Sequence, residues 1–108
     1  MSMSIEQLVS VAHADASAKG FEPGSPAESI ALMHSELSEA LEELRSGRAI
    51  DETYHREDGK PEGVPSELAD VVIRIADFCG HYGIDLSAAI EAKLEFNRSR
   101  PHKHGKQF

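Results

Sequence analysis

The chain of 108 residues contains one cysteine, Cys79, and no long apolar run. A single cysteine excludes an internal disulfide and fits a reduced setting. No apolar run approaches the roughly 20 residues of a membrane-spanning helix. The first residues also lack the basic and apolar regions of a signal peptide. We therefore expect a cytoplasmic protein that has no membrane partner.

Positive charge is scarce as well. There are 11 Lys and Arg residues against 19 Asp and Glu residues, which gives a net charge of −8. Binding to a nucleic-acid polymer requires a basic face, so this balance argues against such a partner. An acidic protein that handles phosphate groups would need metal ions or a local cluster of cations.

Strand-like alternation is missing, and helix signals dominate. The predicted helices run between the signal pairs Ser4 and Gly20, Ser25 and Gly47, Pro65 and Gly83, and Asp85 and Pro101. Serine caps, glycine stops and proline at helix starts support these limits. We predict one all-α domain over residues 1–108, built as a four-helix bundle, with a polar loop at 47–64 and a basic tail at 99–108.

Two acidic pairs lie on neighbouring predicted helices, Glu36 with Glu39 and Glu67 with Asp70. So acidic a chain contains a few such pairs by chance, and a solvated helix face is the ordinary explanation. Their placement favours another interpretation. At 100° per residue, one strip roughly 80° wide holds all the strongly polar side chains of the third helix. These are Glu67, Asp70, Arg74, Asp77 and His81.

Apolar residues flank this strip on both sides, so we expect it to face the bundle or a cleft. The fourth helix has a predicted buried stripe of Leu86, Ala89, Ile90 and Leu94. Lys93 and Asn97 lie in the middle of that stripe. A long lysine stem can reach solvent from such a position, but a buried amide needs hydrogen-bond partners.

Carboxylates that share a partly buried site repel one another unless they are neutralised. A divalent cation would neutralise them. Oxygen-only ligands favour Mg²⁺, with Mn²⁺ possible, over zinc. Because protein-bound Mg²⁺ commonly shares phosphate oxygens with a substrate, Lys93 would supply a further cation for those phosphates.

Three segments carry a family resemblance: "ALMHSELSEALEELRSG", "GKPEGVPSELADVVIRIADFCG" and "GIDLSAAIEAKLEFNRSRPHKHGK". They resemble the MazG-like branch of the all-α nucleoside triphosphate pyrophosphohydrolases. That family carries ExxE on one helix, ExxD on the next, and typically a Lys and an Asn on a following helix. The similarity covers the chain from about residue 19 to its end. Where members often have "GW" after the first helix, this chain has Gly20 and Phe21.

The resemblance implies Mg²⁺-dependent cleavage of a nucleoside triphosphate to the monophosphate and pyrophosphate, by a homodimer or homotetramer. It implies four metal ligands, Glu36, Glu39, Glu67 and Asp70. It also implies that Lys93 and Asn97 contact the phosphates or the sugar. We expect Glu36 or Glu39 to act as the catalytic base. We also expect Arg74 and Asp77 to bind the substrate. Asp77 could be an extra ligand of the metal or could orient Arg74.

Other functions remain open. The substrate could instead be phosphoribosyl-ATP or a nucleoside diphosphate, or the chain could be a catalytically silent helical module that binds a nucleotide or a partner. The polar strip could also be a subunit interface in which Arg74 and Lys93 pair with acids. The loop at 47–64 could be a lid. The basic tail, which holds Lys103 and Lys106, could be solvated or could fold over a polyphosphate.

Overall fold

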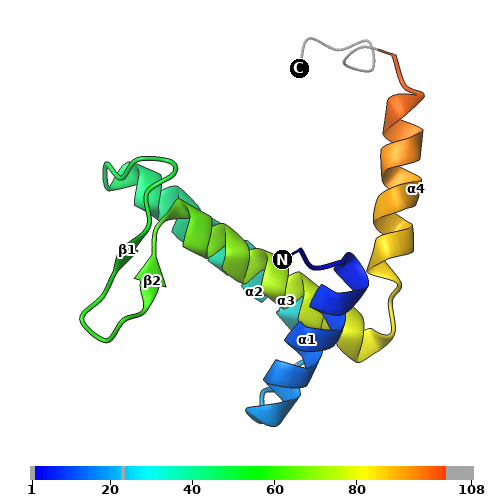
Figure 1. Ribbon diagram of the computed structural model, residues 1–108, viewed down its shortest axis with the longest axis horizontal. Helices are drawn as coiled ribbons and strands as arrows, with labels where there is room; N and C mark the ends of the chain where they lie inside the picture. Colours follow the sequence, from blue (N-terminus) through cyan, green and yellow to red (C-terminus); the bar gives the residue numbers. More distant parts are fainter. Residues whose placement is uncertain (1, 23, 102–108) are drawn as a thin grey trace.

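Four helices and one small hairpin make up this computed structural model, which describes residues 2–22 and 24–101. The elements are α1 (Ile5–Ala18), α2 (Pro26–Arg45), β1 (Tyr54–His55), β2 (Pro61–Glu62), α3 (Val64–Tyr82) and α4 (Leu86–Arg98). Helices α2 and α3 lie side by side, and α1 also packs against α3 (Figure 1). The all-α prediction is confirmed. Most of the predicted basic tail, including Lys103 and Lys106, lies outside the described residues.

The helices begin and end where local signals predict. The Ser4 hydroxyl accepts the Gln7 N–H at 3.1 Å, and the Gln7 side chain accepts the Ser4 N–H at 2.8 Å. Ser25 and Glu28 form the same reciprocal box at the start of α2. These caps satisfy amide groups that have no partner within the helix. Helix α3 begins at Val64, one residue before the predicted Pro65.

The polar loop predicted at 47–64 contains a short hairpin, which the sequence interpretation did not expect. Two antiparallel pairs, Tyr54 with Glu62 and His55 with Pro61, form a short hairpin. Gly63 joins this hairpin to α3 with a φ of 118°, which side chains rarely tolerate. A Cβ atom there would also collide with the Glu52 carbonyl oxygen. Glycine therefore lets the hairpin fold closely against the start of α3.

Small side chains form the crossing of α1 and α3. Ala12, Ala76 and Cys79 are buried, and Ala76 has no exposed surface. A Cβ on Gly80 would lie only 2.6 Å from the His13 Cβ, so the two helices approach at a distance that only glycine permits. Burial raises the pKa of the Cys79 thiol, as expected for a core cysteine. The core is thin because few large side chains are enclosed.

Helix α4 projects away from the pair α2 and α3 (Figure 1). Its only substantial contact with another helix is with α1. The predicted buried stripe is therefore wrong for the single chain: no residue of α4 is buried, and Ala89 and Leu94 are exposed. One chain does not complete a four-helix bundle within the described residues. None of the described helices is both long and apolar enough to cross a bilayer.

Candidate functional site

Three of the predicted carboxylates meet between α2 and α3. Glu36 from α2 and Glu67 and Asp70 from α3 each offer an oxygen, and these oxygens lie within 4.8 Å of one another. Helices α2 and α3 lie side by side and run antiparallel (Figure 1). Glu67 and Asp70 share a face of α3 because residues three positions apart lie on one side of a helix. This spacing of the oxygens suits a single hard cation, which carboxylate oxygens can surround.

Glu67 is the most buried of these acids, with 4% of its surface exposed. Among the described residues, its Oε2 atom is buried and has no hydrogen-bond partner. Burial is the main cause that raises the pKa of Glu67, to about 7, and the neighbouring Glu39 and Glu62 carboxylates raise it further. A buried acid without a compensating donor is costly, so this position is suited to a proton or a cation.

Glu39 lies beside Glu67 but does not belong to the group formed by Glu36, Glu67 and Asp70. Its side chain is exposed to solvent. The two glutamates of the ExxE pair on α2 therefore differ in position. Glu36 is half-buried and faces Asp70, whereas Glu39 borders the site from the solvent side.

Arg74 neutralises part of the acidic site. Its Nε and Nη2 atoms both lie 2.9 Å from Oε1 of Glu36. We predicted that Asp77 would orient Arg74 or act as an extra metal ligand. In the structure, Asp77 instead pairs with Nδ1 of His13 at 3.1 Å, and it is in neither of the carboxylate groups. Asp77 thus links α3 to α1.

A second group of carboxylates was missed by the sequence interpretation. Glu43 of α2, Glu62 of β2 and Glu67 of α3 also have oxygens within 4.8 Å of one another. Glu43 borders the apolar arc of its helix, which was a signal for partial burial. Nothing in the sequence pointed to Glu62, because its place depends on the unpredicted hairpin.

Tyr54 holds Glu43 in this second group. The tyrosine hydroxyl lies 2.9 and 3.0 Å from the two carboxylate oxygens of Glu43, and this hydrogen bond is the main cause that raises the pKa of Tyr54. Arg48 covers the tyrosine ring, with its Cζ atom 3.5 Å from the ring centroid. Arg48 in turn binds Glu52 at 2.8 Å, which lowers the pKa of Glu52.

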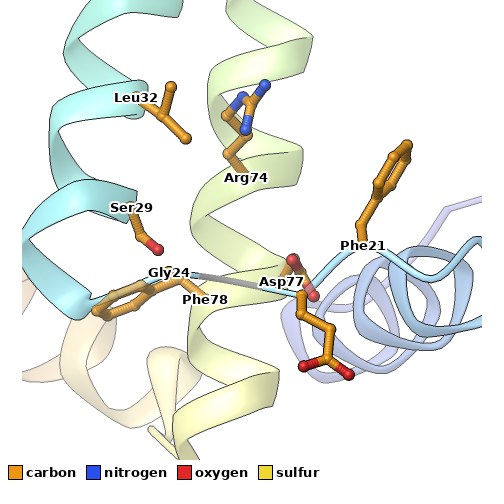
Figure 2. A pocket seen from close by; sticks show the side chains of 8 residues that line it. Phe21, Gly24, Ser29, Leu32, Arg74, Asp77 and Phe78 are labelled. Atoms are coloured by element: carbon orange, nitrogen blue, oxygen red, sulfur yellow. The ribbon is translucent and has the colours of Figure 1, made fainter.

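A small cleft adjoins Arg74 between α2, α3 and the segment that follows α1. Figure 2 shows Ser29 and Leu32 on α2, Arg74, Asp77 and Phe78 on α3, and Phe21 on that segment. The cleft measures about 120 Å³, whereas sites that enclose a small molecule measure roughly 300 to 1,000 Å³. The single chain therefore offers a partial, open site with aromatic and charged walls.

Lys93 and Asn97 are not brought to this site by the single chain. Both are exposed on α4, and α4 has no substantial contact with α2 or α3. The reason is the course of α4, which follows the end of α3 and projects away from the pair α2 and α3 (Figure 1).

The chain matches no family model, no curated protein and no solved structure with which it was compared.

Proposed function

We propose that this protein is a Mg²⁺-dependent nucleoside triphosphate pyrophosphohydrolase of the MazG-like type that maintains the cytoplasmic nucleotide pool. The observation that carries the proposal is the meeting of Glu36, Glu67 and Asp70, whose oxygens lie within 4.8 Å across two helices. The unpartnered, buried Oε2 of Glu67 supports it. The family resemblance implies the reaction, and the spacing of the three carboxylates is compatible with it.

The residues present fit Mg²⁺, with Mn²⁺ as the alternative. The donors are carboxylate oxygens, the type that both ions prefer, and no thiolate or imidazole belongs to this group. A bound Mg²⁺ would neutralise the triphosphate and the charge that develops on phosphorus. Glu36, Glu67 and Asp70 would hold it, with Glu39 at the solvent side.

The remaining side chains of the site would bind the substrate or transfer a proton. Glu39 is the better general base, because Glu36 already accepts a hydrogen bond from Arg74 and is ion-paired with it, whereas Glu39 is open to solvent. Arg74 is half-exposed and lines the cleft, so it can transfer hydrogen bonds from Glu36 to a phosphate. Phe21 and Phe78 in the same cleft supply apolar surface for a base.

A second copy of the chain completes the site in this proposal. Helix α4 carries Lys93 and Asn97 on a surface that has no substantial contact with the carboxylate-bearing helices of its own chain. In a homodimer or homotetramer, α4 of a neighbouring copy would bring the ammonium and amide groups to the phosphates or sugar. It would also enclose the open cleft.

Pyrophosphate release tests the proposal. We expect the full chain with Mg²⁺ and a panel of nucleoside triphosphates to release pyrophosphate. Glu67→Ala and Asp70→Ala should each lower the rate by at least about 100-fold, because each removes a ligand. The matched control is Glu42→Ala, whose carboxylate is exposed and, among the described residues, pairs only with Arg45. It should retain the wild-type rate.

Three results would overturn the proposal. Activity that survives Glu67→Ala and Asp70→Ala would remove the assigned ligands. Release of orthophosphate alone would indicate a hydrolase of another phosphorylated nucleotide. A nucleotide-dependent rise in melting temperature without turnover would indicate a silent binding module.

A further inference from the structure

Glu67 belongs to two groups of carboxylates at once. One group lies toward Glu36 and Asp70, and the other lies toward Glu43 and Glu62. From this arrangement we infer that Glu43, Glu62 and Glu67 form a second binding position for a divalent cation, next to the first. Neither Glu43 nor Glu62 belongs to the ExxE and ExxD pairs, and the hairpin supplies one of the three ligands.

The unpartnered Oε2 atom of Glu67 is an independent sign of a missing ligand. Only 4% of the surface of Glu67 is exposed to solvent, and no hydrogen-bond donor among the described residues reaches its Oε2 atom. Its neighbours in both groups are acids, which as carboxylates can only accept hydrogen bonds. A cation is the ligand that satisfies acceptors arriving from several directions.

The cationic side chains of the described residues only partly neutralise this second group. Lys60 and Arg56 approach one oxygen of Glu62, at 3.5 and 3.9 Å. Both cationic side chains are 54% exposed, so solvent weakens these pairs. No ion pair joins Glu43 or Glu67 to a basic side chain among the described residues, although the Tyr54 hydroxyl fixes the orientation of Glu43.

The ligand class follows from the donors. Three carboxylates without sulfur or imidazole suit Mg²⁺ or Mn²⁺. A carboxylate shared by two positions is also the arrangement of paired metal sites, in which the ions lie about 4 Å apart and clamp both ends of a phosphoryl displacement. In that catalytic role the inference rests on the proposed function, but binding of the cation can be measured without substrate.

A Mn²⁺ titration followed by electron paramagnetic resonance tests the second position. The full wild-type chain without nucleotide should bind two Mn²⁺ ions per chain. Glu62→Gln and Glu43→Gln should each weaken one of the two by at least about tenfold. The matched controls are Glu57→Gln in the same hairpin and Glu42→Gln on the same helix, both exposed. These should bind as the wild type does.

The outcomes separate this inference from the proposed function. One Mn²⁺ ion in the wild type, or two ions with unchanged affinity in both Glu62→Gln and Glu43→Gln, would overturn the second position. Pyrophosphate release could persist in that case. Two Mn²⁺ ions in the wild type, one of them weakened as predicted in Glu62→Gln and Glu43→Gln, would uphold the second position. If the same wild-type chain releases no pyrophosphate, only the proposed function is contradicted. Circular dichroism of each variant checks that its fold is retained.

Discussion

The protonation of Glu67 should make the stability of the metal-free protein depend on pH. The pKa of Glu67 is raised to about 7 in the folded chain from an ordinary value of 4.5, chiefly by burial and then by Glu39 and Glu62. The folded state therefore retains a proton that the unfolded state releases. The contribution of Glu67 to stability is greatest below pH 4.5, falls as the pH rises toward 7, and levels above it. The expected loss is on the order of 3 kcal/mol at most.

Urea unfolding in the presence of EDTA at pH 5 and at pH 8 measures this loss. Glu67→Gln removes the titrating group, so its unfolding free energy should change less between the two pH values than that of the wild type. The difference in pH dependence between the two proteins reports the titration of Glu67 in its acidic surroundings. Equal pH dependence in both proteins would contradict the assignment.

The sequence predicted the acids of the first group better than their partners. Helical periodicity placed Glu67 and Asp70 on one face of the third helix, and the family resemblance associated Glu36 with them. The pairing of Arg74 with Glu36 and of Asp77 with His13 could not be predicted. Those pairs depend on how α1 and α2 are rotated and placed against α3, and periodicity within one helix does not contain that information.

At the scale of the elements, caps were predictable and the hairpin was not. Capping boxes at Ser4 and Ser25 involve groups three residues apart, so the sequence alone contains them. The strands have two residues each, which is too short for any alternation of polar and apolar side chains. As a result the sequence identified Glu67 but missed Glu62, its neighbour across the turn at Gly63.

Gly63 should be essential to the position of the hairpin. Gly63→Ala places a Cβ against the Glu52 carbonyl oxygen at a φ of 118°, so we expect the hairpin to shift. Gly59→Ala is the matched control, because its φ of 89° is also positive but no atom lies within 4 Å of the new Cβ. Both substitutions carry backbone strain of about 1 kcal/mol or more. Only Gly63→Ala adds a collision.

Thermal unfolding and metal binding measure the difference. Gly63→Ala should have the lower melting temperature of the two variants, and it should also lose affinity for the second Mn²⁺ ion as Glu62 moves away from Glu67. If both alanine variants melt at the same temperature, the close contact between Gly63 and Glu52 does not determine the position of the hairpin.

At the scale of the whole molecule, the sequence predicted which faces are apolar but not what covers them. The stripe of Leu86, Ala89, Ile90 and Leu94 on α4 was read as core, yet α4 lies apart from α2 and α3. An apolar stripe indicates that a helix face favours contact with other apolar surface. It does not indicate whether that surface belongs to the same chain or to another.

Helix α2 has a second apolar face that the described part of the chain leaves open. Ile30, Leu37, Leu41 and Leu44 are between 44% and 57% exposed. At 100° per residue they fall within about 60° of one another. We call these four residues the α2 stripe. Isolated exposed leucines are common in proteins, but an aligned row of them indicates a contact surface.

A second copy of the chain is the partner we expect on the α2 stripe, because a chain with so thin a core gains stability from association. Leu37→Glu combined with Leu41→Glu should convert the oligomer to a monomer, since the charges would be buried unpaired at the interface. Light scattering during size-exclusion chromatography measures the mass. Ala31→Glu, an exposed position on another side of α2, is the control and should leave the mass unchanged. An unaltered oligomer in the double variant, or a monomeric wild type, would show that the α2 stripe does not join two copies.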